Sequence, residues 1–423
     1  MCDSAVALGA ETASGHTLFA KNSDRKAGEC QPFEQHPAAH HAPGSRVRCT
    51  HLAIPQVAET YAVMGHSPEW VWGFEHGVNE HGVAIGNHTV FSNEPIEETP
   101  GLIGMDLVRL GLERGRTARE ALEVIATLLE SHGQGGAALA PDATGYHNGF
   151  LLADPGNAWR LETTNRRWAA RQVRREACTN HYALDTSWAI ASSDFAAWAR
   201  AAGYWRPASR VDVAAALRNP HIPRHLTEGR ARRAREILDA GGGALDVAAF
   251  AALLRDHGEG GPAWTAGDAG PGEERYFTLC AHSDPVQRTT ASLVAELPDR
   301  HRASWPVWIG FATPCTGILL PVYLGGTLPA SLARRLDGVD GPSAWWRFQQ
   351  LDAAVAKDPE RATPRVRAAW APLERDIERE RAQVEREARG GGDAARVLTD
   401  FMERTVARAL ERAEELAREL QAG

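Results

Sequence analysis

The chain has 423 residues, enough for one large domain or two medium ones with an ample core. Its formal net charge of −8 argues against nucleic acid or an anionic membrane as the main partner. No apolar run approaches the about 20 residues that span a bilayer, and the six cysteines are scattered without a CxxC pair. We therefore expect a soluble cytoplasmic protein with reduced thiols, without a disulfide framework or a zinc site.

The first predicted strand, Ser4–Leu8, follows directly on Cys2, and no basic-then-apolar leader precedes it. A small side chain at position 2 allows Met1 to be removed, so the mature protein could begin with cysteine. Its thiol, with a reference pKa of about 8.5, would then share a residue with an α-amine of pKa about 7.7–8.0. This is the nucleophile and base of enzymes whose N-terminal residue attacks an acyl group. The alternative is an incidental cysteine.

The second predicted strand, Thr17–Lys21, ends in a polar cluster that runs to Arg25. If the first two strands pair as a hairpin, this cluster lies close to Cys2. Asp24 could then hold the α-ammonium or orient the thiol, and a cation at Lys21 or Arg25 would favour the thiolate. The alternative is a strand-end salt bridge.

The elements that follow alternate between strands and helices. Further strands are predicted at Tyr61–Met64, Trp70–Phe74 and Gly82–Gly86. Two helices lie within Gly101–Glu130, the second opened by a capping box from Thr117 to Glu120. A meander is predicted over Gly149–Ala153, Ala158–Glu162 and Trp168–Val173, then mostly helix over 190–260, a loop over 258–272, and strands at Thr278–His282, Thr290–Leu297 and Val307–Phe311. This order predicts a layered α+β domain.

The last seventy or so residues carry apolar positions at helical spacing on both sides of Gly390–Gly392. This pattern predicts a helical hairpin whose long apolar stripe is covered by the body of the protein or by another subunit. We expect another subunit to cover the stripe, and hence a homo-oligomer. The predicted domains are a catalytic domain over 1–330 and a helical extension over 331–423.

Two asparagines are candidates for the stabilisation of an oxyanion. Asn87 ends an otherwise apolar strand, and Asn180 follows another strand. An amide at either position could donate a hydrogen bond to a tetrahedral intermediate. The alternatives are a plain hairpin around Asn79–Gly82 for the first segment and a loop cap for Asn180.

Four side chains are assigned to substrate binding: Lys21, Asn22, Arg25 and Arg288. Arg288 lies in the polar run Gln287–Ser292 before a predicted strand, where it could reach a substrate pocket. The alternative is an edge strand with polar residues.

Metal and cofactor sites are not predicted. His36, His40 and His41 lie in a loop rich in Pro and Gly, with no carboxylate or thiol at ligand spacing. Cys280 and His282 could form a nucleophile–base pair, but alternate residues share a strand face, so core packing is the other interpretation.

Taken together, these segments resemble peptidase family C69, the dipeptidases and secernins among the N-terminal nucleophile hydrolases, with the closest likeness to the secernins. The resemblance keeps its order over residues 1 to about 330. It rests on Met1–Asp3, Phe19–Arg25, Ile54–Val57, Trp70–Asn87, Gly104–Leu110, Gly133–Gly136 and Thr290–Val294.

The resemblance implies a four-layer αββα fold, Cys2 as nucleophile with its own amine as base, and cleavage of amide bonds in short peptides. By similarity to the penicillin and bile-salt amidases, Asp24 would sit beside Cys2, and Asn87 and Asn180 would match the oxyanion amides. Lys21 stands where those relatives carry arginine, and Leu293 stands where they carry a later arginine. The alternatives are an amidase or acyltransferase of the same fold acting on a non-peptide acyl compound, and a non-catalytic interaction protein.

Overall fold

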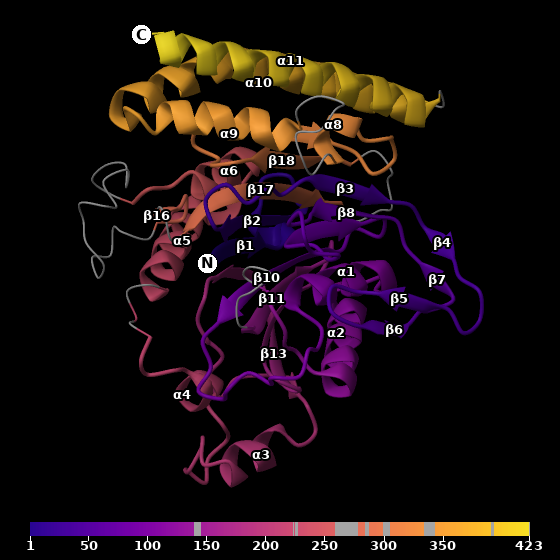
Figure 1. Ribbon diagram of the computed structural model, residues 1–423, viewed down its shortest axis with the longest axis vertical. Helices are drawn as coiled ribbons and strands as arrows, with labels where there is room; N and C mark the ends of the chain where they lie inside the picture. Colours follow the sequence, from indigo (N-terminus) through magenta and orange to yellow (C-terminus); the bar gives the residue numbers. More distant parts are fainter. Residues whose placement is uncertain are drawn as a thin grey trace.

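Two β-sheets dominate the structure, a computed structural model that describes residues 1–138, 145–222, 224, 227–258, 278–283, 287–298, 305–333, 343–390 and 393–422 (Figure 1). The first sheet has the order β14-β1-β2-β17-β18-β19, with β16 also paired to β17. Its strands are β1 Cys2–Ala7, β2 Thr17–Arg25, β14 Arg175–Cys178, β16 His282–Ser283, β17 Gln287–Leu297, β18 Val307–Phe311 and β19 Leu320–Val322.

The second sheet has the order β15-β13-β12-β11-β10-β9-β8-β3. Its strands are β3 Phe33–His36, β8 Val63–His66, β9 His76–Asn79, β10 Ala84–Val90, β11 His147–Ala153, β12 Ala158–Thr164, β13 Arg167–Val173 and β15 Ile190–Ala191. Two short ribbons lie beside it, β4 Ala39–His40 with β7 Glu59–Thr60, and β5 Arg46–Arg48 with β6 Ala53–Pro55.

The helices pack on the outer faces of the sheets and at one end of the molecule. They are α1 Gly104–Arg114, α2 Ala118–His132, α3 Phe195–Ala201, α4 Val213–Leu217, α5 Glu228–Gly241, α6 Val247–Leu254, α8 Ala330–Ala333, α9 Ala344–Val355, α10 Pro359–Arg389 and α11 Ala394–Ala422, with 3-10 turns η1 Gly9–Glu11 and η3 Gly242–Ala244. Among the helices of the described ranges, none is long and apolar enough to cross a membrane.

In the β1–β2 hairpin, alternate side chains point to opposite faces of the sheet, because successive residues of a strand face opposite sides. Val6 and Phe19 enter the core shared with the second sheet, whose strands β10 and β11 contact β1. Ala5 and Ala20 pack instead with α5 and α6 on the outer face. The register pairs Cys2 with Ser23, so both belong to the face that looks toward the second sheet. On the far side of that sheet, α1 and α2 cover a separate apolar cluster.

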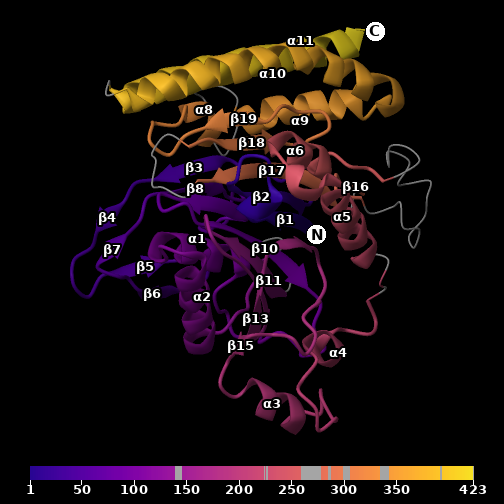
Figure 2. The same ribbon diagram turned by 180° about the vertical axis from the view of Figure 1, so that it is seen from behind.

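The predicted C-terminal hairpin is α10 and α11, stacked with α9 over the β18 side of the first sheet (Figures 1 and 2). The apolar stripe of α11, which includes Leu398, Phe401, Met402 and Leu416, is buried in the same core cluster as β18 and α9. The chain thus covers the stripe itself, which removes the reason for expecting a second subunit there. The boundary placed after residue 330 falls inside α8.

The prediction of a strand is wrong for two segments, because backbone N–H groups of these segments donate to residues outside any sheet. Trp70–Phe74 is a loop laid against α1, where Phe74 donates its main-chain N–H to Met105 O. A Cβ at Gly73 would lie 2.1 Å from the same Met105 oxygen, so the close approach requires glycine.

Thr278–His282 is also irregular up to the two-residue β16, because Cys280 donates its N–H to Asp256 O at the end of α6. The helix-rich stretch 190–260 consists of α3 to α6 with irregular segments between them. Most of the loop expected over 258–272 lies outside the described residues.

Candidate active site

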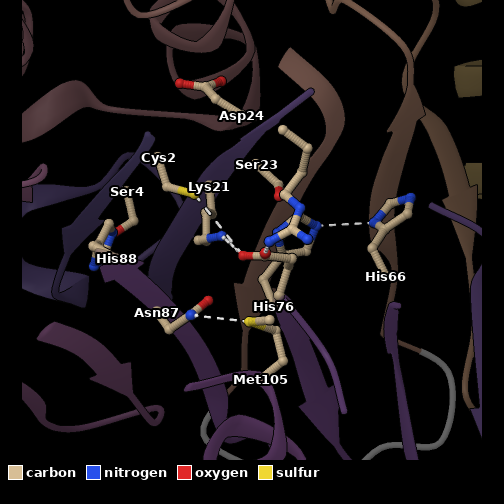
Figure 3. A network of polar contacts seen from close by, with 12 residues as sticks. Cys2, Ser4, Lys21, Ser23, Asp24, His66, His76, Asn87, His88 and Met105 are labelled. Carbon is tan, nitrogen blue, oxygen red and sulfur yellow. Dashed lines mark hydrogen bonds and ion pairs between the residues drawn. The ribbon is translucent and has the colours of Figure 1, made fainter. Parts of the chain in front are cut away.

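Cys2 begins β1 on the face between the two sheets and is buried. Its sulfur contacts Glu75 Oε2 at 3.9 Å, and Glu75 precedes β9 of the second sheet (Figure 3). Burial raises the pKa of the Cys2 thiol, an effect that the nearby Lys21 ammonium opposes and Glu75 reinforces. The resting sulfur is therefore a neutral thiol, and attack by it requires a base.

The main-chain nitrogen of Cys2 donates a hydrogen bond to Asn180 Oδ1 at 2.9 Å. The same oxygen accepts from the Arg230 guanidinium of α5 at 2.6 Å, while Asn180 Nδ2 donates to Thr89 O at 2.9 Å. Thr89 takes one of the two hydrogens of Nδ2, so the oxyanion role expected of Asn180 stays a prediction. The contacts also direct the carbonyl oxygen of this side chain at the nitrogen that would become the α-amine.

Lys21 and Arg25 lie on β2, on the same face of the sheet as Cys2, and both pair with Glu75. Lys21 Nζ is 3.1 Å from Glu75 Oε2, and an Arg25 nitrogen is 3.1 Å from Oε1. Burial lowers the pKa of Lys21, but the Glu75 charge, joined by that of Cys2 once its thiol is ionised, outweighs this effect and raises the pKa. Burial alone would raise the pKa of Glu75, yet Lys21 and Arg25 hold it below its ordinary range. The site thus contains a buried ionised carboxylate between two cations.

Asn87 lies on β10 across the gap between the sheets and faces this carboxylate. Its Nδ2 donates to Asn148 Oδ1 at 3.2 Å, and Figure 3 shows its contact with Met105 Sδ at 3.5 Å. With the amide turned over, its nitrogen donates to Glu75 O at 3.0 Å and to Glu75 Oε2 at 2.9 Å. The turned orientation meets better acceptors, and it puts a second donor beside Lys21 on the oxygen nearest to Cys2.

Asp24 belongs to the opposite face of β2, and its carboxylate points away from the Cys2 sulfur (Figure 3). It accepts a hydrogen bond from Thr289 Oγ1 at 2.7 Å and lies 3.8 Å from an Arg230 nitrogen. Arg230 also pairs with Asp3. Burial raises the pKa of both carboxyls, that of Asp3 to about 7, against the attraction of Arg230. Asp24 is thus linked to the main chain of Cys2 through Arg230 and Asn180.

Asn22 and Arg288, both expected to bind substrate, have structural partners elsewhere. The Asn22 amide donates to Leu254 O and Leu279 O at 2.8 and 2.7 Å, on the outer face of the first sheet. Arg288 pairs with the buried Asp352 of α9 at 2.7 Å. The Asn22 contacts lie on the face opposite Cys2, whereas Arg288 is paired with Arg25 in the register of β2 and β17 and so belongs to the Cys2 face, where Asp352 holds it.

Buried histidines near the nucleophile are neutral. His88 Nε2 is 2.8 Å from Ser4 Oγ, and His66 pairs with His76 at 2.9 Å. Burial and the positive charge of Lys21 lower the pKa of all three rings, that of His66 to about 3. None of these three rings contacts the Cys2 sulfur.

Glu75 and Arg230 are the site residues that the sequence analysis missed. Glu75 is a lone carboxylate inside an otherwise apolar and aromatic segment, and such a residue indicates a buried ion pair. Arg230 carries no local signal, because it lies 227 positions from Asp3 in the chain, on a helix with many other arginines.

Residues 5–198 match the family model described as Peptidase family C69. This match begins within β1, three residues after Cys2, and reaches beyond Asn180.

Among solved structures, a mutant of conjugated bile acid hydrolase from Clostridium perfringens is similar at 14% identity, with 76% of this chain and 92% of that chain covered and a TM-score of 0.44. Penicillin V acylase from Agrobacterium tumefaciens gives 14% identity, 76% and 86% coverage and a TM-score of 0.42. An N-acylethanolamine-hydrolyzing acid amidase orthologue from Caenorhabditis elegans has 12% identity and a TM-score of 0.36, with 70% of this chain and 94% of that chain covered.

Proposed function

We propose that this protein is a cysteine-type hydrolase of amide bonds in short peptides, resembling the dipeptidases, with the four-layer αββα arrangement of the N-terminal nucleophile hydrolases and closest kinship to the secernins. The observation that carries the proposal is the double anchoring of Cys2. Its main-chain nitrogen is held by Asn180, while its sulfur contacts Glu75, whose carboxylate also accepts a hydrogen bond from Lys21 of the neighbouring strand β2. The match of residues 5–198 to a peptidase family supports the same class.

In the proposed reaction, loss of Met1 converts the nitrogen held by Asn180 into a free α-amine. This amine takes the thiol proton, and the thiolate attacks the carbonyl carbon of the scissile amide. Lys21 and the Asn87 amide would stabilise the oxyanion, since both are directed at the region beside the sulfur. The ammonium then returns its proton to the leaving nitrogen, which departs as an amine and leaves a thioester on Cys2.

The second half of the reaction uses the same groups. A water molecule gives a proton to the α-amine and attacks the thioester, and the collapsing intermediate expels the sulfur. The acid product leaves, and Cys2 recovers its proton. The raised pKa of the thiol makes this arrangement necessary, because a buried neutral thiol needs a base within reach.

Intact mass and turnover of three variants test the proposal. The wild-type protein should lack Met1 and gain one adduct with a thiol-directed acylating electrophile, whereas Cys2→Ala should fold normally, gain no adduct and show no turnover. Cys2→Ser should keep at most a trace of activity. Cys49→Ala, at a buried thiol in a different cluster, is the matched control.

A substrate panel then separates the alternatives. Dipeptides should be cleaved in preference to N-acyl amides. Turnover of the acyl amides alone would favour the non-peptide amidase, and full turnover by Cys2→Ala would rule out the mechanism.

A further inference from the structure

Four side chains that can bind a metal converge away from Cys2: His257, Cys280, His282 and Cys315. His257 follows α6, Cys280 and His282 lie at β16, and Cys315 lies in the β18–β19 connection. Their ligand atoms all lie within 4.8 Å of one another. The tertiary structure therefore assembles a two-cysteine, two-histidine set from three separate segments.

The distances within this set fit a shared tetrahedral ion. His282 Nε2 is 3.3 Å from Cys280 Sγ, 3.4 Å from Cys315 Sγ and 3.2 Å from His257 Nε2. With bonds of about 2.0–2.1 Å to nitrogen and about 2.3 Å to sulfur, a tetrahedral zinc ion spaces its ligand atoms about 3.3–3.8 Å apart. The three distances to His282 are close to this spacing, and all four ligand atoms lie within 4.8 Å of one another.

Hydrogen bonding accounts poorly for the same geometry. An imidazole nitrogen offers one proton or one lone pair, so His282 Nε2 can serve one partner in the ring plane. Three atoms approach it at nearly equal distances. A cation at the centre would satisfy all of them together.

Burial and ligand chemistry point to the same ion. Cys280, His282 and Cys315 are buried, and His257 is half-buried. Two thiolates and two neutral imidazoles carry a charge of about −2, which one divalent ion neutralises away from water. Tetrahedral S₂N₂ coordination is typical of zinc, and four protein ligands leave no open position for substrate.

We propose that His257, Cys280, His282 and Cys315 form a structural zinc site. The ion would connect α6 and the β18–β19 connection to β2, the strand that pairs with the strand of Cys2. This departs from the expectation of no metal, which rested on ligand spacing along the chain. The spacing Cys-x-His is unusual, and the other two ligands lie 23 residues before it and 33 residues after it.

Contacts around the cluster show what the ion would hold. Asn22 of β2 donates to Leu254 O, shortly before the ligand His257 in the chain, and to Leu279 O, directly before the ligand Cys280. Next to Cys280, the Ala281 N–H donates to Thr289 Oγ1, which itself donates to Asp24. Loss of the ion would thus loosen the support of the outer face of β2 before it touched any reacting atom.

Metal content of the full-length protein tests the proposal. Protein purified under reducing conditions without chelator should contain about one zinc ion per chain by plasma mass spectrometry. Exchange with cobalt should give the visible bands of tetrahedral cobalt together with thiolate charge-transfer absorption. Removal of the metal should lower the melting temperature, and added zinc should restore it.

Serine variants test whether the two cysteines are ligands of the metal. Cys280→Ser and Cys315→Ser should each lower zinc content at least about fivefold, whereas Cys49→Ser should retain it. Fewer than about one zinc per ten chains in fully reduced wild-type protein would overturn the proposal. So would a disulfide between Cys280 and Cys315, or full zinc content in both variants. These readouts need no hydrolysis, so they stand apart from the fate of the proposed function.

Discussion

The carbonyl oxygen of the Asn180 side chain lies 2.9 Å from the main-chain nitrogen of Cys2, although 178 positions separate the two residues in the chain. This contact fixes the nitrogen that the proposed mechanism uses as its base. It also separates Asn180 from Asn87, because Asn180 contacts Cys2 directly, whereas the Asn87 amide, when turned over, contacts Glu75.

Alanine variants of Asn87 and Asn180 should therefore show different kinetic defects. Asn87→Ala should lower kcat by about 10²–10³ with little change in KM, as expected for an oxyanion donor. Asn180→Ala should lower kcat by a similar factor and also shift the acidic limb of the pH–rate profile, because the amine loses its acceptor. Steady-state kinetics across pH distinguish them. A pure loss of affinity in Asn87→Ala would show that this residue binds substrate.

A tag fused ahead of Cys2 should abolish activity even though the thiol remains. The tag turns the α-amine into an amide, which cannot accept a proton, and it displaces the terminus that now contacts Gln287. The same tag placed after the last residue should leave turnover unchanged. Equal activity of the two proteins would show that another base serves Cys2.

Replacing Glu75 should change both stability and the reactivity of the thiol. Glu75→Gln leaves Lys21 and Arg25 without their shared buried carboxylate, which should cost about 3–5 kcal/mol of unfolding free energy. Because the Glu75 charge raises the pKa of Cys2, the variant should be alkylated faster at neutral pH. Denaturant titration and the pH profile of alkylation measure the two effects.

Glu29→Gln is the control for this variant, since Glu29 pairs with Arg25 and does not contact the Cys2 sulfur. An alkylation profile that shifts equally in the two variants would mean that Glu75 acts through general charge and not through its position.

Stability should fall as pH rises through the range set by Asp3. Its folded pKa of about 7 exceeds the unfolded value of about 3.9, so between these values the folded state holds a proton that the unfolded chain has lost. Asp3→Asn should weaken the decline in unfolding free energy from about pH 5 to about pH 8. Urea titrations at both values test this, with Asp194→Asn at an exposed carboxylate as the control. Identical slopes in all three proteins would contradict the raised pKa.

A chain ended at Arg389 should unfold or aggregate. The buried side chains of α11 include Leu398, Phe401, Met402 and Leu416, each of which contributes about 1.5–3 kcal/mol by burial. Their sum is comparable with the whole stability of a typical domain. Light scattering and melting curves of the shortened and full-length proteins give the answer. A shortened chain that stays monodisperse and active would mean that α11 is dispensable.

Local pattern was sufficient wherever the relevant contacts are close in sequence. The alternation of Ser4–Leu8 and Thr17–Lys21 predicts the β1–β2 hairpin, which the register of Cys2 on Ser23 confirms. The Thr117 hydroxyl caps α2 as predicted by accepting from the Glu120 N–H, although the Glu120 carboxylate accepts from Arg116. The meander and the two long C-terminal helices also follow from periodicity, because their stabilising interactions recur within a few residues.

Contacts between distant segments were decided by the tertiary structure. The sequence does not reveal that Glu75 lies between Lys21 and Arg25, or that Asn180 presents its oxygen to Cys2 and its nitrogen to Thr89. Nor does the spacing of Cys280 and His282 show that Cys315 joins them. Burial explains these pairings. A charge or amide that is removed from water needs a hydrogen-bond or ion-pair partner, and only the packing of the sheets and helices determines which distant residue is close enough to be that partner.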